Sequence, residues 1–450
     1  MVAHLALDRA LLEKYACTEP CKAPYFPLTL WREDFSAQDY RLAAQTSNED
    51  PIPRPLSISL HLPDCHELDG TSACHEANAA RHAARIDDYL DHLEREIVLQ
   101  AALFDKDRQI EHVHISGDLA TCMKYSHWER LFDVLAHHFS LTQSDQPTST
   151  IDVRPDSVSP AYIALLGELG FTHLNLIDPP RTTLSGRGSS GFSVEALAPL
   201  IDAGRQAQLQ GVGITLAYGH PQQTLASFEA DLVKLLTLRP DRVSLCHHHF
   251  LDAANGAAML PLERLQQAIL HFTQAGYLHL GLGHFVLAKD EMALAWHRGT
   301  LRYDSRGYSS HGVCDLIGLG AGAFGQLDDS YSQNVLDLSH YFRYLDRGRL
   351  PVWRGYQLNF DDLLRREITH RLLCGQEVDI AAIEERYHIM FRHYFAPELK
   401  ALTSFAEDAL VMLTPDTIRL LPPGYALLGP VAALFAPFKR KARQRLFRIV

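Results

Sequence analysis

The sequence lacks the features that would place the protein in a membrane, on nucleic acid or outside the cell. It has no run of about 18 apolar residues, so we expect no membrane insertion. Its net charge of −12 argues against a nucleic-acid partner. The start, MVAHLALDRALLEKY, carries charges inside its apolar stretch and is unlike a secretory signal, which predicts a cytoplasmic protein. The eight cysteines are scattered, which favours reduced thiols over a disulfide framework.

Familiar catalytic motifs are also missing. There is no G-x-S-x-G elbow, no P-loop and no H-E-x-x-H. The stretch GLGAGAFG (318–325) resembles a dinucleotide loop, but no βαβ unit with a later acid surrounds it. These motifs therefore assign no catalytic residue.

A regular alternation of strand-like and helix-like segments begins at Pro55. Apolar runs predict strands at residues 56–62, 110–115, 150–153, 173–177, 212–217 and 242–246. Helical periodicity fills the intervals between them, which indicates parallel βαβ units and an α/β fold built on an incomplete (β/α)6 barrel. Sites in such barrels lie at the carboxyl ends of the strands. The residues at those ends are Cys65, Ser116, Arg154, Asp178, Tyr218 and His247.

The flanking regions have a different pattern. Residues 1–50 are irregular, with one short helix near 10–15, and form an N-terminal arm. We assign the barrel to 51–330 and a mainly helical C-terminal domain to 331–450. A short strand pair is predicted near 410–421, and a last helix over 425–438.

One cysteine loop carries a specific resemblance. Residues 60–74 read L-H-L-P-D-C-H-E-L-D-G-T-S-A-C. This resembles the cluster loop, C-x3-C-x2-C-x-C, of the oxygen-independent coproporphyrinogen III oxidases, radical S-adenosylmethionine proteins of haem synthesis. Cys65 and Cys74 match the first and last cysteines, whereas Asp69 and Ser72 stand at the two between.

The resemblance continues along the chain. YGHPQQT (218–224), PDRVSL (240–245), GYLHLGLGHF (276–285), RGYSSHG (306–312) and DLIGLGAGA (315–323) are similar to ordered family motifs. The resemblance implies a radical S-adenosylmethionine-type partial barrel, a helical C-terminal domain and an arm over the barrel mouth.

The departures from the family pattern are equally ordered. The first three family cysteines hold a [4Fe-4S] cluster that binds S-adenosylmethionine, and oxygen ligands replace thiolates poorly. The family's G-G-G-T-P turn is here Ser116, Gly117 and Asp118, followed by Leu-Ala. We therefore expect neither the cluster nor S-adenosylmethionine, and interpret both the loop and the turn as vestigial.

Three functional hypotheses follow. The first is a non-catalytic homologue that binds haem or a porphyrin, with a protein partner in haem metabolism. Its ligand-binding candidates are His61, Tyr218, His247, His249, His284, Arg154 and Arg354. The second is an active oxidase with unorthodox cluster ligation by Cys65, Cys74 and an arm cysteine, Cys17 or Cys21. The third is a zinc site built from Cys65, Asp69, Cys74 and His75.

Overall fold

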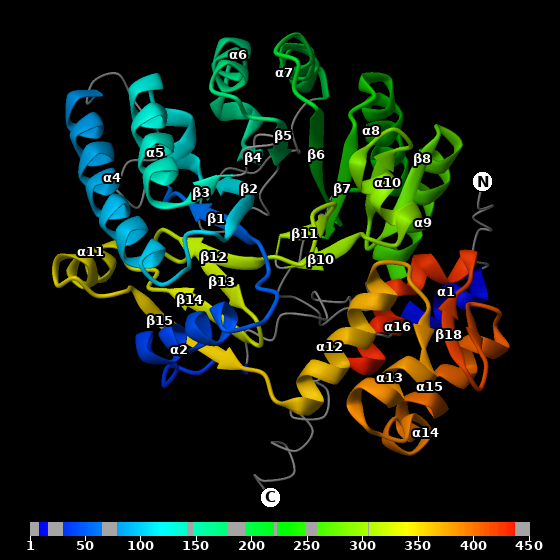
Figure 1. Ribbon diagram of the computed structural model, residues 1–450. Coiled ribbons are helices and arrows are strands. Elements are labelled where there is room, and N and C mark those ends of the chain that lie inside the picture. The colour runs from blue at the N-terminus through cyan, green and yellow to red at the C-terminus, as the bar shows by residue number, and fades with distance from the viewer. Residues whose placement is uncertain are drawn as a thin grey trace, which may run out of the picture.

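The computed structural model describes residues 9–16, 30–64, 79–141, 147–177, 194–219, 223–247, 259–304 and 306–436. One curved, 13-stranded sheet runs through most of them (Figure 1). Its order is β15-β14-β13-β12-β1-β2-β4-β5-β6-β7-β9-β8, with β3 (Ser140–Leu141) paired to β2. No helix among these residues is long and apolar enough to cross a membrane.

The parallel part of the sheet confirms the predicted partial barrel. Its strands are β1 (Leu56–His61), β2 (Gln109–Ser116), β4 (Thr148–Val153), β5 (His173–Ile177), β6 (Gly211–Tyr218), β7 (Arg242–His247) and β12 (Asp315–Leu319). β12 pairs with β1 and is a seventh parallel strand that the sequence analysis missed. Its five residues are all buried, so it lacks the alternation of polar and apolar residues that marks a half-buried strand.

Helices cover the outer face of the barrel (Figure 1). They are α4 (Ala79–Ala101), α5 (Tyr125–His138), α6 (Pro160–Glu168), α7 (Val194–Gln206), α8 (Leu225–Leu238) and α9 (Met259–Gln274). Leu90, Leu93 and Ile97 recur at helical spacing on α4 and are buried. They join one core with Ile58 and Leu60 of β1, and burial of apolar area is the main term that stabilises this layer.

Antiparallel strands finish both ends of the sheet. β9 (His284–Leu287) and β8 (Tyr277–Gly281) follow β7, and α10 (Glu291–Arg298) comes next in the chain. β13 (Phe324–Leu327), β14 (Ser330–Asn334) and β15 (Val352–Gln357) follow β12, and α11 (Leu338–Asp346) connects the last two. The predicted domain division at residue 330 thus falls inside β14, and the division itself stays a prediction.

The C-terminal region has its own hydrophobic core and is mainly helical. It contains α12 (Phe360–Leu373), α13 (Ile380–Tyr387), α14 (Phe391–Tyr394), α15 (Ala396–Glu407), the small sheet β16 (Val378–Asp379), β17 (Val411–Leu413) and β18 (Thr417–Leu420), the 3-10 helix η6 (Pro422–Leu427) and α16 (Leu428–Phe435). The single helix predicted over 425–438 is therefore η6 followed by a short α16, because Pro422 and Pro423 restrict the first turn.

The described part of the N-terminal segment contains two helices, where one was predicted. α1 (Arg9–Ala16) packs against the C-terminal region, where the Tyr15 and Phe405 rings stack 4.4 Å apart. α2 (Ala37–Asn48) begins with a capping box between Ser36 and Asp39 and lies on β13, β14 and β15. Between the two helices, Arg32 pairs with Gly355 through two backbone hydrogen bonds of 2.8 and 3.1 Å.

Candidate functional site at the carboxyl ends of the strands

The barrel face that turns away from the helices is polar and rich in histidine. Successive strand side chains point to opposite faces, so every second residue shares this face. The register places His114 beside Thr150, Thr150 beside His173, and Asp152 beside Asn175. Gly213 leaves room in this layer, because a Cβ atom there would lie 2.5 Å from Asn175 Oδ1.

A hairpin fills the amino-terminal half of this face. β10 (Arg302–Asp304) and β11 (Gly307–Ser309) are joined by a turn from which Arg306 reaches the sheet. Its guanidinium donates to Ser57 Oγ at 2.9 Å and is hydrogen-bonded to His112 Nδ1 at 3.0 Å. It also pairs with Asp304 at 2.6 Å. This half of the barrel is a structural polar cluster.

His112 and His173, which lie on this face, are neutral near pH 7. Burial and the neighbouring Arg242 lower the pKa of His173 to about 4. Burial lowers the pKa of His112 well below its ordinary value, and Arg306 adds to this effect. A neutral imidazole accepts a hydrogen bond from a guanidinium without charge repulsion. Arg306 and Arg242 can therefore lie beside His112 and His173.

A second layer lies nearer the strand ends. His114 Nε2 is 3.1 Å from an oxygen of Asp152, and Asn175 donates to the other oxygen at 2.9 Å. Burial alone would raise the pKa of Asp152, but His114 and Asn175 lower it below its ordinary value. Asp152 is therefore a carboxylate held by two neighbours.

His61 and Ser116 meet at the barrel mouth. They end the neighbouring strands β1 and β2, and His61 Nδ1 is 3.1 Å from Ser116 Oγ. Burial lowers the pKa of His61, so its ring is neutral near pH 7. No described residue is hydrogen-bonded to its Nε2 atom.

The turn after β2 contains an ion pair. Gly117 has φ 107°, and the 3-10 helix η3 (Asp118–Cys122) begins immediately after it. Asp118 pairs with Arg154 at 3.1 Å, and Arg154 also pairs with Asp156 at 2.8 Å. Burial raises the pKa of Asp118, and Arg154 opposes that rise. Arg154, a predicted carboxylate-binding residue, is thus already held by two acids of the chain.

Arg354 lies elsewhere on the sheet. It extends from β15, donates to Gln333 Oε1 at 2.8 Å and lies over the Trp353 ring at 4.4 Å. Gln333 in turn donates to the carbonyl of Gly322, which follows β12. These contacts give Arg354 a packing role in the antiparallel part of the sheet.

Two other predicted ligand-binding residues are packed into the protein core. Tyr218 ends β6 and packs on Phe228 of α8, and burial raises its pKa to about 12. His284 is hydrogen-bonded to Ser244 at 2.9 Å, and burial lowers its pKa to about 4. His247 ends β7 beside Tyr218 in the register. These contacts favour a structural role for Tyr218 and His284.

The remaining predicted site residues lie outside the described residues. They are Cys17, Cys21, Cys65, Asp69, Ser72, Cys74, His75, Asp178 and His249, and the side chain of His247. Within the described ranges, no group of three or more His, Cys, Asp or Glu residues could hold a metal ion.

Cys314 and Cys374 are free thiols. Burial raises the pKa of Cys374 to about 12 and that of Cys314 above its ordinary value. Cys122, at the end of η3, is disulfide-bonded, so the prediction of reduced thiols fails at this position. Scattered spacing in the sequence did not indicate this bond.

Sequence reasoning missed the polar cluster around Arg306, His112 and His114. The residues 110–116, I-E-H-V-H-I-S, alternate histidine with apolar residues, and this period of two indicates a strand with one polar face. This pattern could have predicted the polar face of the strand. The hydrogen bond from Arg306 to Ser57 could not have been predicted, because it is a tertiary contact between residues far apart in the sequence.

The fold and the strand-end site together define a radical S-adenosylmethionine-type partial barrel. The solved structure of coproporphyrinogen III oxidase (HemN) from Escherichia coli, described as a radical SAM enzyme, matches with a TM-score of 0.80 and 28% identity. The match covers 97% of this chain and 100% of that one.

Sequence comparison identifies the family. The oxygen-independent coproporphyrinogen III oxidase of Escherichia coli K12 is 31% identical over 459 residues, covering 99% of each chain. The oxidase of Pseudomonas aeruginosa is 30% identical over 463 residues and covers all of both chains. No protein-family model matches the chain. The chain belongs to the oxygen-independent coproporphyrinogen III oxidase family.

Proposed function

We propose that this chain has lost the radical chemistry of its family and instead binds a haem or porphyrin. The observation that carries the proposal is the pair Asp69 and Ser72, which stand at two cysteine positions of the cluster loop. A carboxylate and a hydroxyl are hard oxygen donors, and iron–sulfur clusters are held by thiolates. The remaining donor set does not suit a [4Fe-4S] cluster.

The turn after β2 supports the same conclusion. Asp118 and its partner Arg154 lie at the strand ends where the sequence resemblance implies a glycine-rich turn that binds S-adenosylmethionine. An ion pair with bulky side chains prevents the close backbone approach that glycines allow. The cofactor site and the cluster loop are thus altered independently.

Tetrapyrrole binding rests on the family and on His61. The relatives are named for coproporphyrinogen, a tetrapyrrole, and we propose a ligand of this class here. A neutral imidazole nitrogen is a common ligand of haem iron, and Nε2 of His61 is the candidate at the mouth. The protein would then act in the cytoplasm as a carrier, a sensor or a partner of another protein of haem metabolism.

Titration of the full chain with haem and with coproporphyrin, followed by Soret absorbance, tests this proposal. We expect saturable binding of haem at micromolar concentrations, with His61→Ala or His247→Ala shifting the Soret band. His393→Ala is the matched control, because His393 is exposed on α14. No absorbance change with either ligand would refute tetrapyrrole binding. Unaltered bands in both variants would refute the axial assignment.

The same preparation distinguishes the active-oxidase alternative. After anaerobic treatment with iron and sulfide, the wild-type chain is expected to lack the brown absorbance of a cluster. If absorbance develops and S-adenosylmethionine is cleaved, the loss of radical chemistry is wrong. Metal analysis of the isolated protein, with Cys65→Ala as the comparison, tests zinc in the loop.

A further inference from the structure

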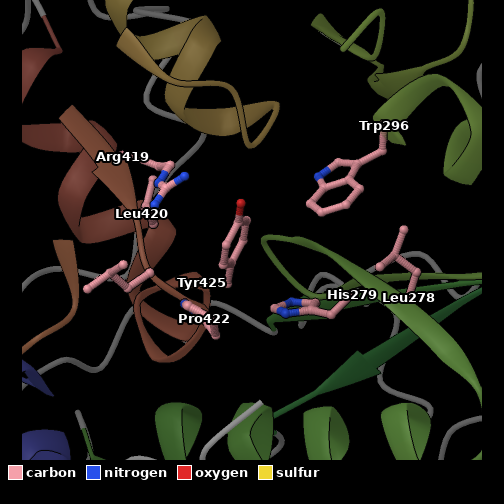
Figure 2. Close-up of a pocket in the computed structure, with 8 residues that line it drawn as sticks. Leu278, His279, Trp296, Arg419, Leu420, Pro422 and Tyr425 are labelled. Atoms are coloured by element: carbon pink, nitrogen blue, oxygen red, sulfur yellow. The ribbon is translucent and has the colours of Figure 1, made fainter. Parts of the chain in front are cut away.

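A small cavity lies between the edge of the barrel and the C-terminal region, away from the strand-end site (Figure 2). Its volume is about 270 Å³. β8 contributes Leu278 and His279, and α10 contributes Trp296. The opposite wall comes from the end of β18 and from η6, which supply Arg419, Leu420, Leu421, Pro422 and Tyr425.

The walls are apolar and aromatic. The rings of Trp296 and Tyr425 are 6.4 Å apart and inclined at 61°. The His279 ring is stacked on Phe285 at 4.8 Å, so it forms a flat part of the wall. Pockets for drug-sized ligands occupy roughly 300–1,000 Å³. This cavity therefore suits one aromatic ring with a short chain, and it is too small for a tetrapyrrole.

One polar group at this cavity, the indole N–H of Trp296, has unmet hydrogen-bonding capacity. Trp296 Nε1 is buried and has no hydrogen-bond partner. Figure 2 shows this nitrogen on the side of the indole that faces Tyr425. A buried donor without a partner is destabilising, and a ligand oxygen would relieve that cost.

Arg419 supplies a positive charge at the rim. It is exposed, and its guanidinium contacts Met412 Sδ at 3.8 Å. It forms no ion pair with any residue in the described part of the chain, and no acid lines the cavity. Its charge acts on Tyr425, where it opposes the rise in pKa that burial causes. The cavity is thus apolar inside and cationic at its entrance.

We propose that this cavity binds a small aromatic monocarboxylate. The ring packs against the wall that Trp296 and Tyr425 form together, and the carboxylate faces the Arg419 guanidinium, which suits such an anion through two parallel hydrogen bonds. The site is separate from the barrel mouth and does not depend on the function proposed above.

Isothermal titration with phenylacetate and with its neutral isostere, phenylacetamide, tests the site in the full chain. Phenylacetate is expected to bind saturably and more tightly than the amide. Arg419→Gln is expected to weaken phenylacetate binding about tenfold and to leave the amide unchanged. Arg392→Gln is the matched control, because Arg392 is an exposed arginine on α14 and does not line the cavity.

A second variant fills the cavity itself. Leu278→Trp adds bulk to the cavity wall and is expected to abolish binding of both probes, while the thermal unfolding midpoint shows that the variant is folded. Absence of saturable phenylacetate binding to the wild-type chain would overturn the proposal. Equal affinities in the wild type and Arg419→Gln would do so as well.

Discussion

Gly117 is held in place by the backbone of a neighbouring segment. A Cβ atom at this position would lie 1.7 Å from the carbonyl oxygen of Leu62, and its φ of 107° is one that other residues rarely adopt. The glycine that survives in the altered turn is therefore explained by the packing of β1 against β2. It gives no indication that a cofactor still binds.

We expect Gly117→Ala to destabilise the protein by at least about 3 kcal/mol, because both the contact and the backbone angle become unfavourable. Urea unfolding followed by circular dichroism measures the change. Gly276→Ala is the matched control: Gly276 also has a positive φ, 88°, but nothing lies within 4 Å of the added methyl group. That variant should lose only about 1 kcal/mol, the effect of the backbone angle. Similar losses in both variants would contradict the close contact as the reason for the glycine.

Individual site residues were predictable where they end strands. His61 and Ser116 end β1 and β2, and parallel pairing brings such ends together, as the sequence pattern implied. The partners of Arg154 and Arg354 were not predictable. A long arginine side chain can contact any acid or ring nearby, so its partner depends on the fold. The partner of Arg154 is Asp118, and that of Arg354 is the Trp353 ring.

At the scale of elements, Glu96 connects four segments. This residue of α4 is fully buried, and its carboxyl group accepts hydrogen bonds from Gly320 N at 2.8 Å, Asn334 Nδ2 at 2.6 Å and Tyr341 Oη at 2.5 Å. Gly320 follows β12, and a Cβ there would lie 2.0 Å from the carbonyl oxygen of His61. Glu96 thus fixes the loop beside the barrel mouth.

We expect Glu96 to make the free energy of unfolding depend on pH. Burial raises its pKa from 4.5 to about 7, so the folded chain binds this proton more tightly than the unfolded chain does. Its contribution is present below pH 4.5 and falls as the pH rises through 7, by about 3 kcal/mol in all. We expect Glu96→Gln to flatten this part of the profile in urea unfolding between pH 4.5 and 8. Glu129→Gln, at an exposed position of α5, should leave the profile unchanged. A wild-type profile without this decline would show that Glu96 is ionised in the folded chain.

Most elements of the barrel follow from periodicity, and the exceptions have physical causes. β5 has the predicted bounds, 173–177, because its apolar run is bounded by a turn before it. β12 is buried along its whole length and shows no alternation, and α2 is polar on most of its surface, with only four buried residues. β12 and α2 are both stabilised by tertiary contacts, which the local sequence does not predict.

At the scale of the whole molecule, α1 connects the N-terminus to the C-terminal region. Tyr15 is 4% exposed, and its hydroxyl donates to Asp408 at 2.6 Å. Lys14 pairs with the same carboxylate at 2.6 Å. α1 also contacts α9, so this helix joins the barrel to the last third of the chain. The resemblance implied an arm over the barrel mouth. Of the two described helices of that arm, α1 lies against α9 and α15, and the course of the arm over the mouth stays a prediction.

We expect Tyr15→Ala to release α1, because removing a buried aromatic ring typically loses about 3–5 kcal/mol of local packing. Hydrogen–deuterium exchange should then show the amides of residues 10–16 exchanging much faster than in the wild type, while those of the barrel strands stay protected. Lys14→Ala is the comparison: its side chain is 46% exposed, and solvent screening leaves an ion pair of this kind with little effect on stability. Equal protection of α1 in the wild type and Tyr15→Ala would contradict the role of this contact.

The short pairing between Arg32 and Gly355 has a consequence for solubility. β15 is an edge strand of the sheet. The unpaired amides and carbonyls of an exposed edge strand can form hydrogen bonds with a strand of another chain. Arg32 occupies two of those groups, and α2 shields the neighbouring strands. This pairing therefore reduces the number of backbone groups that β15 offers to a second copy of the chain.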